Sequence, residues 1–550
     1  MANLYPNLIY LGHAAFLYQT SKFIILMDPW LDANGAYFNS WYQFPCNHHL
    51  QEPIISLFER DSRSKYIYIS HHDKDHLDVN FLKKINHLNV KLLIPNFSRK
   101  DEITAKLTDI SKFNPSKFQF FDDYSSIKIF DHELKFYIQD SDRESDSSIL
   151  VKSKSFNFLN TNDCKLHDRI PSIIKEEGPI DFLTMQFSGA SWHPVTYKDF
   201  YKEEKYNSIS IKKKLNRFKV LSKTIEISKI RNYIPSAGPP CFLDPELFNI
   251  NFEKNNIFPS KNEISDYLKT HNKNLKIIDI NPGDKLSLQD LNISNYYSEN
   301  INFIGIDPYK DKKKYLEKYQ KVCINNFTKK YNFNSKEILD KFFNELRDKI
   351  SLFNFTNEVK RNLYFKIVRI NNIPKIIRVD FVLKEIKYVE NTDQENFYLV
   401  EIKEKDLFRY INDNLNFHDF LLSCKQKMAR KPDEYDYLID SFMCLDQSSF
   451  KSFRNKHTNF KLANIERINV NFENNEYEID RYCPHENADL KHGIINEEGM
   501  IICPRHCWEF DLNNNGICKR SPSFSINSRK LELKNKNFKD KEKFIDFKIK

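Results

Sequence analysis

The sequence has few glycines, few cysteines and no long apolar run, and each scarcity excludes a class of protein. Only 10 of its 550 residues are Gly and only 10 are Cys. So few cysteines exclude a disulfide-stapled scaffold, and the scarce glycines are expected where the backbone requires them. No uncharged apolar run approaches the ~20 residues that span a bilayer, so an integral membrane protein is not expected. Met1–Tyr10 contains neither a basic segment nor a small-residue cleavage site, which predicts a cytosolic protein.

Charged residues are abundant but almost balanced. The sequence holds 84 Lys and Arg against 75 Asp and Glu, and no basic block is interleaved with aromatic residues. Nucleic acid is therefore not an expected partner. The basic tail, residues 529–550, mixes Lys with Asp and Glu. We interpret this tail as a solvated surface, with a docking surface for an acidic partner as the alternative.

The order of apolar patterns predicts three regions. Over residues 1–250, strand patterns alternate with helical ones, and Lys65–Ser70 runs directly into a cluster of His and Asp. Such alternation predicts a layered α/β domain. Residues 251–450 combine charged helical patterns with strand patterns, which predicts an α+β region with an antiparallel sheet. Residues 451–550 carry short strand patterns and turns, which predicts a small all-β domain.

Four residues near the carboxyl end form the most specific motif of the sequence. Cys483 and His485 are two positions apart, so their side chains point the same way in an extended segment. Cys503 and His506 are spaced to converge through a tight turn. Two thiolates and two imidazoles in this order match a Rieske [2Fe–2S] cluster, in which one iron takes two Cys and the other takes two His.

A structural zinc site is the alternative for these four residues. Zinc fingers usually pair Cys with Cys and His with His, whereas each pair here joins a Cys to a His, so the iron–sulfur cluster is favoured. Trp508, Phe510 and Asp511 follow the second pair, as in the Rieske domains of oxygenases. The first loop has no third Cys for a bracing disulfide. Cys507, where such domains often carry Gly, is interpreted as a packed side chain rather than a ligand.

A second cluster of potential metal ligands follows the predicted strand Lys65–Ser70. It comprises His71, Asp73, Asp75 and His76. Imidazole and carboxylate groups at this density suit Zn²⁺, Fe²⁺ or Mn²⁺. A polar strand-to-helix turn without a metal is the alternative for this segment.

This cluster resembles the metallo-β-lactamase signature His-x-His-x-Asp-His, with Asp73 at the second His position. Leu11–Ala14 followed by Asp28–Trp30 is similar to the opening of the lactonase-like and phospholipase-D-like branch of that superfamily. Asn160–Asp163 resembles the strand end from which the fold supplies a metal-binding aspartate, which makes Asp163 a candidate ligand. The resemblance implies an αββα sandwich for the N-terminal domain.

Such a domain joined to a Rieske domain is similar to the CMP-N-acetylneuraminate hydroxylase family. The segments that carry the likeness are Leu8–Ala14, Asp28–Leu31, Tyr68–His71, Asp75–Leu77, Asn160–Cys164, Gly189–Ser191, Pro235–Gly238, Ile280–Gly283 and Arg430–Tyr435. Animal members of that family carry the Rieske domain first. A C-terminal Rieske domain resembles the UDP-N-acetylmuramate hydroxylases, which make the same change from N-acetyl to N-glycolyl. The resemblance therefore implies the chemistry and leaves the sugar open.

Two departures from the family pattern concern metal ligands. Asp73 replaces a His, and the His that the family carries before the Asn-Thr-x-Asp segment is absent. The acidic residues in that region are Asp140, Asp142, Glu144 and Asp146. His193 would compensate for a missing ligand, with an ordinary loop histidine as the alternative. His13 is a candidate for a ligand or for a residue that supports one.

The resemblance implies a monooxygenase that hydroxylates the N-acetyl group of a nucleotide-activated sugar. Cys483, His485, Cys503 and His506 would bind the cluster. His71, Asp73, Asp75, His76 and Asp163 would supply the ligands of one or two metal ions, with iron favoured because zinc is not redox-active. O₂ and a separate ferredoxin-like or cytochrome-like electron donor are expected partners, since no Gly-x-Gly-x-x-Gly fingerprint for a flavin or NAD is present.

The sequence leaves the phosphate-binding residue and two other functions open. Arg430, Lys431 and Arg231 are candidates for the substrate phosphate by residue type alone. One alternative function is a metal-dependent hydrolase with an accessory Rieske domain, because most proteins with this N-terminal fold use metal-bound hydroxide. The other is an electron carrier or redox sensor whose layered domain has lost its metal.

Overall fold

A computed structural model describes most of the chain. The described residues are 6–141, 144–189, 191–295, 304–329, 331–369, 373–413, 415–446, 449–450, 453 and 466–531. Contacts divide the chain into two compact units, Met1–Asn459 and Phe460–Lys550. None of the described helices is long and apolar enough to cross a membrane.

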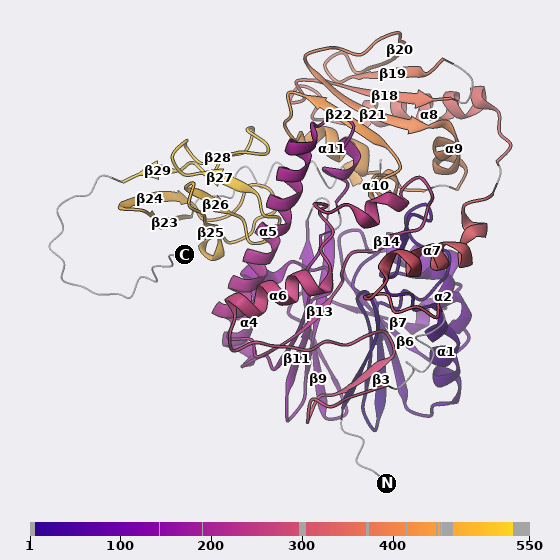
Figure 1. The fold of residues 1–550 in the computed structure, drawn as a ribbon, viewed down its shortest axis with the longest axis vertical. Helices are drawn as coiled ribbons and strands as arrows, with labels where there is room; N and C mark the ends of the chain where they lie inside the picture. The colour runs from indigo at the N-terminus through magenta and orange to yellow at the C-terminus, as the bar shows by residue number, and fades with distance from the viewer. Residues whose placement is uncertain are drawn as a thin grey trace. The chain divides into compact units, whose positions relative to one another are not determined.

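The first unit begins with two packed sheets (Figure 1). The strands of the first sheet are β1 (Asn7–Gly12), β2 (Ala15–Gln19), β3 (Phe23–Met27), β5 (Ser64–Tyr68), β6 (Lys91–Pro95), β7 (Phe118–Phe121), β16 (Asp284–Ser287) and β17 (Ile293–Asn295). The strands of the second are β8 (Ser126–Ile129), β9 (His132–Asp140), β10 (Ser145–Lys152), β11 (Asn157–Asn160), β12 (Phe182–Gln186), β13 (Asn232–Ser236) and β15 (Lys276–Ile277). Because β15, β16 and β17 follow residue 250, the layered part extends beyond the range that the sequence suggested.

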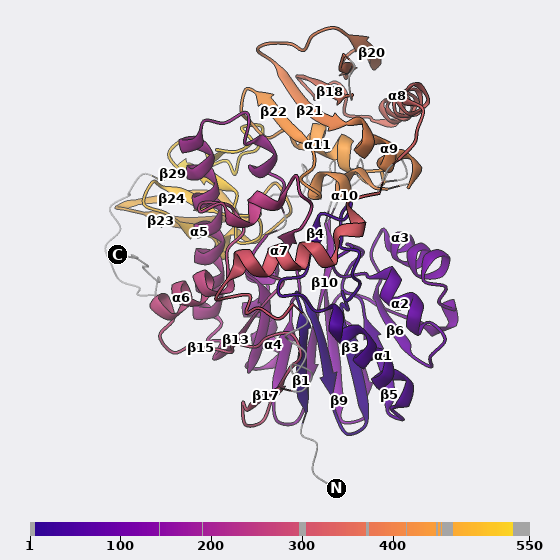
Figure 2. The ribbon, with the colours of Figure 1, turned by 45° about the vertical axis from the view of Figure 1, so that its right-hand side comes forward.

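Helices cover the outer face of each sheet (Figures 1 and 2). On the first sheet these are α1 (Gln51–Arg60), α2 (Val79–Ile85) and α3 (Lys100–Ala105), and on the second α4 (Ile170–Glu177), α5 (Glu203–Ile227) and α6 (Lys261–His271). One apolar core joins the two sheets, for example Phe16 with Phe158, and a second lies between the second sheet and α4, α5 and α6. The predicted αββα sandwich is therefore confirmed.

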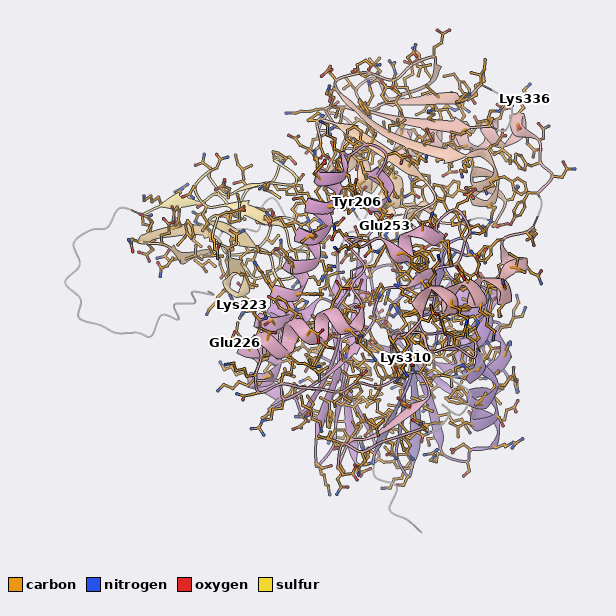
Figure 3. The ribbon with its side chains drawn as sticks, in the orientation of Figure 1. Tyr206, Lys223, Glu226, Glu253, Lys310 and Lys336 are labelled. Carbon is orange, nitrogen blue, oxygen red and sulfur yellow. The ribbon has the colours of Figure 1, made fainter. Side chains whose placement is uncertain are left out.

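The long helix α5 is also tied to the segment that precedes α6. The hydroxyl of Tyr206 donates to Glu253 Oε2 at 2.6 Å, and the two side chains point toward one another (Figure 3). Lys198 forms an ion pair with the other carboxylate oxygen of Glu253 at 2.6 Å. These contacts fix the chain that leads into α6.

The middle region forms a mixed sheet, not the antiparallel sheet that the sequence predicted. Its strands are β18 (Asn362–Val368), β19 (Lys375–Asp380), β20 (Glu385–Val389), β21 (Phe397–Lys403) and β22 (Lys427–Lys431), in the order β20-β19-β18-β21-β22. The chain crosses from the edge strand β20 to the far side of β18, so β18 and β21 run parallel while the other pairs are antiparallel.

The middle region also contains helices, of which α10 (Phe417–Leu422) contacts the layered part. The other described α-helices of this region are α7 (Lys312–Val322), α8 (Ser335–Leu352), α9 (Glu404–Asn412) and α11 (Tyr437–Cys444). Trp41 Nε1 donates to the carbonyl of Leu422 at 2.8 Å, and Lys74 forms an ion pair with Asp419 at 3.1 Å. The end of α10 is thereby anchored beside the segments that follow β3 and β5.

The described part of the second unit contains two small antiparallel sheets, which confirms the predicted all-β domain. One sheet holds β23 (Arg467–Phe472), β24 (Asn475–Asp480) and β29 (Arg529–Lys530); the other holds β25 (Ile494–Ile495), β26 (Met500–Ile502), β27 (Glu509–Asp511) and β28 (Ile517–Cys518). The loop after β24 and the turn between β26 and β27 carry the Cys and His pairs.

Candidate metal centres

The residues predicted to bind a metal in the N-terminal domain meet at one edge of the sandwich. His71, Asp75 and His76 follow β5, and Asp163 follows β11 in the opposite sheet. β5 has parallel partners in its sheet and β11 pairs parallel with β12. Side chains at the carboxyl ends of such strands converge on one edge, which is where α/β proteins bind ligands.

Two overlapping groups of three potential ligands form there. One consists of His13, Asp75 and His76, and the other of His71, His76 and Asp163; within each group the ligand atoms lie within 4.8 Å of one another. His76 Nε2 lies 3.6 Å from Asp163 Oδ1 and 4.0 Å from Asp75 Oδ2. The structure thus brings four of the five predicted residues together and adds His13, which comes from the turn between β1 and β2.

The atoms that face one another in these groups fit a bound cation. His76 Nε2 and Asp163 Oδ1 are buried and have no hydrogen-bond partner among the described residues. Polar atoms left in this state are costly unless an ion or a water satisfies them. The donor set of imidazoles and carboxylates suits iron, zinc or manganese.

The charges in the cluster are mutually stabilising. Burial opposes ionisation of Asp163, but the neighbouring imidazole of His76 outweighs it and lowers the pKa of this carboxyl to about 2. Burial likewise disfavours the charged form of His76, yet Asp163 and Asp75 raise its pKa well above the usual value. The carboxylates are therefore ionised at neutral pH, as metal ligation requires, and a bound cation would displace the proton from His76.

Residues around the cluster fix its orientation, and none of them is among the five predicted ligands. Asp28 Oδ2 lies 3.0 Å from His76 Nδ1, which leaves Nε2 to face the other ligands. Tyr37 donates to Asp75 Oδ1 at 2.6 Å. Asp146 Oδ1 lies 3.2 Å from His71 Nδ1. The Asp28-Pro29 motif pointed to the first of these; no local pattern pointed to Tyr37.

Two predicted residues lie apart from both groups. Asp73 Oδ2 is 3.6 Å from His71 Nε2 but belongs to neither group, so its role as a ligand stays a prediction. His193 does not compensate for a missing ligand in either group. Its Nε2 lies 3.0 Å from the hydroxyl of Tyr201 and 3.4 Å from Arg430 Nη2.

The three basic residues considered for a phosphate are not grouped as a site. Arg430 is buried, and its guanidinium lies 3.0 Å from Asp433 Oδ1. Lys431 forms an ion pair with Glu395 at 2.8 Å. Arg231 is exposed in the segment before β13. Burial and the pairing with Asp433 account for Arg430 without a bound phosphate.

In the second unit, two loops of the same shape carry the predicted cluster ligands. The N–H of Cys483 donates to the carbonyl of Ala488 at 2.9 Å, and the N–H of Cys503 donates to that of Trp508 at 2.8 Å. The fifth residue of each loop has a positive φ, 55° at Asn487 and 54° at Cys507. This conformation explains why glycine suits the position of Cys507.

The two loops converge, and the arrangement fits a [2Fe–2S] cluster. Both thiols are buried, and the backbone N–H groups two and three residues after each Cys donate to its sulfur. Such donors stabilise thiolates. The rings of His485 and His506 lie 4.8 Å apart, and Trp508 stacks on His485 at 4.0 Å. Arg505 Nη1 donates to the carbonyl of Glu486 at 2.8 Å, so a hydrogen bond braces the loops without a disulfide.

Comparison with a protein-family model decides the nature of this unit. Residues 442–530 match the Rieske [2Fe-2S] domain. The chain contains a Rieske domain. It is 27% identical to a putative Rieske 2Fe-2S iron-sulfur protein of Mycobacterium tuberculosis, over 94% of this chain and 98% of the relative.

The chain is also similar to the CMP-N-acetylneuraminate hydroxylases. The cytidine monophosphate-N-acetylneuraminic acid hydroxylase of Xenopus laevis is 30% identical over 42% of the chain and 37% of the relative. That of Asterias rubens is 22% identical over 80% of the chain and 65% of the relative. The suspected family resemblance is thereby confirmed.

Solved structures similar to the chain include a diiron β-hydroxylase from Streptomyces venezuelae. It is 14% identical, with a TM-score of 0.32 over 50% of this chain and 52% of that one. A possible metal-dependent hydrolase from Veillonella parvula has a TM-score of 0.34 at 10% identity, over 52% of this chain and all of that one. These scores are too low to add to the fold described above.

Proposed function

We propose that this protein is an iron-dependent monooxygenase that converts an N-acetyl group of a nucleotide-activated sugar to N-glycolyl. The sugar is CMP-N-acetylneuraminate-like or UDP-N-acetylmuramate-like. The observation that carries the proposal is the pairing, in one chain, of a Rieske domain with a buried cluster of imidazoles and carboxylates. Relatives named as hydroxylases support the oxidoreductase class.

The candidate ligands give the two units separate roles, and those of the first unit would bind the catalytic metal. His76, Asp75 and Asp163 would hold the metal, together with His71 or His13. Iron bound there would supply the O₂ chemistry that attacks an unactivated C–H bond, which zinc cannot supply. Asp28 and Tyr37 hold His76 and Asp75 in place, and burial of these groups excludes bulk water from the centre.

Electrons would enter through the Rieske domain. Cys483, His485, Cys503 and His506 would bind its cluster, which passes one electron at a time. A separate ferredoxin-like or cytochrome-like protein would supply them, in the cytosol. The basic tail, considered as a docking surface for this donor, lies outside the described residues beyond residue 531.

Metal content and electron paramagnetic resonance of the purified protein test this proposal. The cluster alone accounts for two iron atoms per chain. Iron in clear excess of two, with a Rieske spectrum, supports the oxygenase. Two iron atoms with bound zinc would favour the hydrolase, and two iron atoms alone would favour an electron carrier.

A further inference from the structure

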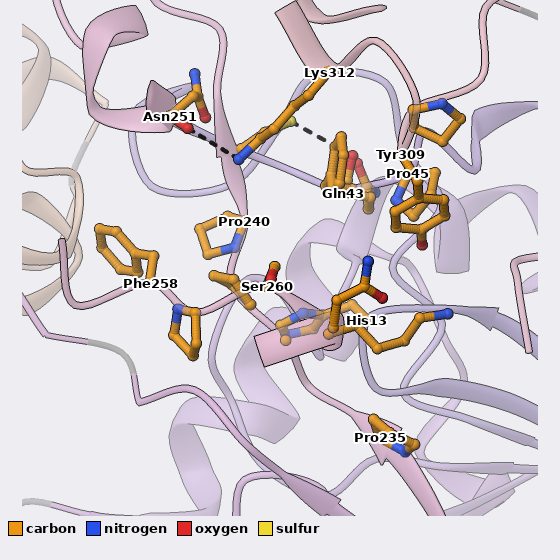
Figure 4. A pocket seen from close by; sticks show the side chains of 18 of the residues that line it. His13, Gln43, Pro45, Pro235, Pro240, Asn251, Phe258, Ser260, Tyr309 and Lys312 are labelled. Atoms are coloured by element: carbon orange, nitrogen blue, oxygen red, sulfur yellow. Dashed lines mark hydrogen bonds between the residues drawn. The ribbon is translucent and has the colours of Figure 1, made fainter. Parts of the chain in front are cut away.

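A cavity of about 280 Å³ opens beside the metal cluster in the first unit (Figure 4). Its volume is near the lower end of the ~300–1,000 Å³ range of small-molecule sites. Half of its 24 described lining residues are aromatic or proline, among them Tyr10, Phe44, Pro240, Phe258 and Tyr309. Proline rings have a fixed φ, so much of this wall is rigid.

The charged side chains in the described wall of the cavity are all positive. The described lining residues include Lys261 and Lys312 but no Asp or Glu. Lys261 already forms an ion pair with Asp279 outside the lining. Lys312 Nζ donates to the carbonyl of Asn251 at 2.9 Å and forms no ion pair with a described carboxylate. Lys312 is exposed as a whole residue, but protein atoms near its ammonium group lower its pKa by desolvation, and an anion beside the group would oppose this shift.

Two helices begin at the same cavity. Lys312 is the first residue of α7, and Ser260 caps the first turn of α6 by accepting the N–H of Glu263 at 3.2 Å. Backbone N–H groups and the positive end of the helix dipole favour anions at such positions. Carboxylates already cap both ends, because Glu263 accepts the N–H of Ser260 and Asp311 accepts that of Lys314, so Lys312 remains the cation available to an anion.

The cavity also reaches the metal cluster. His13 lines it and belongs to one of the two groups of potential ligands. His13 and Lys312 lie on different sides of the cavity in Figure 4. Pro235, Gly238 and Ile280, from segments that resemble the hydroxylase family outside the metal ligands, line the space as well.

We propose that this cavity is the substrate site, in which Lys312 binds an anionic group of the substrate and the uncharged end of the substrate faces His13. The identity of that uncharged end, an N-acetyl group, rests on the function proposed above. The anion is the phosphate of a nucleotide or the carboxylate of a sugar acid. The aromatic wall accepts the planar or apolar part of the same ligand.

Calorimetric binding to the full-length protein tests the proposal without turnover. The probes are CMP, UMP, the neutral nucleosides cytidine and uridine, and the sugar acid N-acetylneuraminate. At least one anionic probe should bind, and Lys312→Met should weaken its binding on the order of tenfold, because a charge-assisted contact is lost. Lys312→Arg should retain most of the affinity. Lys313→Met, which removes an exposed charge from the next position of α7, should bind like the native protein.

The outcomes separate the two anions and the two proposals. Binding of CMP or UMP identifies a phosphate, whereas binding of the sugar acid alone identifies a carboxylate. Three results would overturn the anion site. The first is equal affinity of Lys312→Met and Lys313→Met for every probe, and the second is no binding of any probe. The third is equal affinity for nucleotides and neutral nucleosides with no binding of the sugar acid. None of these failures affects the metal content that tests the oxygenase, and loss of the extra iron would leave the binding result standing.

Discussion

The hydroxyl of Tyr37 donates to one carboxylate oxygen of Asp75 at 2.6 Å, while the other oxygen lies 3.2 Å from Nε2 of His13. The two oxygens of Asp75 therefore face different partners. Burial and the nearby carboxylates of Asp73 and Asp75 raise the pKa of Tyr37 well above its usual value, so Tyr37 stays a hydrogen-bond donor. Tyr37 thus holds Asp75 in one orientation toward the candidate metal centre.

Removal of the Tyr37 hydroxyl should lower the affinity of the N-terminal centre for its metal. We expect Tyr37→Phe to weaken metal retention at the N-terminal centre by about 10–100-fold, since supporting hydrogen bonds orient ligands. Competition with a chelator, followed by metal analysis, measures the effect. Tyr66→Phe, a half-buried tyrosine on β5 outside both groups of ligands, should retain the metal. Equal retention in both variants would remove the positioning role of Tyr37.

His76 is common to both groups of potential ligands, so its loss should be the most damaging. We expect His76→Ala to lose the iron in excess of the cluster and all turnover, while the Rieske spectrum persists. Absorption and electron paramagnetic resonance spectra with iron analysis check this. His87→Ala, at an exposed position after α2, is the matched control and should keep both metals.

The reverse experiment separates the two centres. His506→Ala should abolish the Rieske spectrum and leave the iron of the N-terminal centre bound, because the two sets of ligands belong to different units. Persistence of the Rieske spectrum in this variant would contradict the assignment of the cluster ligands.

Cys507 occupies a left-handed backbone conformation that a β-branched residue cannot adopt without strain. We expect Cys507→Gly to bind the cluster and to raise the stability of the Rieske unit by about 1 kcal/mol, and Cys507→Val to lower it by about 1–3 kcal/mol. Thermal bleaching of the cluster absorption reports both changes. A large loss of cluster in Cys507→Gly would instead assign the thiol a role as a ligand.

His48 should make the first unit sensitive to acid. Burial lowers the pKa of His48 to about 4 from 6.5, with its ring 3.1 Å from Gln43 and 3.0 Å from the hydroxyl of Tyr319. The unfolded chain therefore binds more protons between these two pH values, and the contribution to stability is complete above pH 6.5 and lost as the pH falls toward 4. The loss amounts to up to about 3 kcal/mol.

Urea denaturation at pH 7.5 and pH 5, followed by tryptophan fluorescence, checks this effect. His48→Gln keeps a polar side chain that does not titrate, so the variant should lose less stability between the two pH values than the native protein. His87→Gln, an exposed histidine, should behave like the native protein. An unchanged pH dependence in His48→Gln would place the acid sensitivity elsewhere.

The parts of the fold and the site that the sequence predicted are those that depend on local spacing. The Cys and His pairs of the Rieske loops, the candidate ligands after β5 and the layered sandwich all carry short-range patterns. Tyr37 is 38 positions from Asp75 in the sequence, and no local pattern joins them. The parallel pairing of β18 with β21 and the burial of Arg430 depend on long-range packing in the same way.

The central claim is that oxygen from O₂ enters the N-acetyl group of a nucleotide-activated sugar. The most direct test is mass spectrometry of CMP- and UDP-linked N-acetyl sugars incubated with the reduced protein and ¹⁸O₂. The account predicts a product heavier by one labelled oxygen, located in the acyl group. Oxygen derived from water, or cleavage products without an oxygenated sugar, would contradict the account and favour a hydrolase.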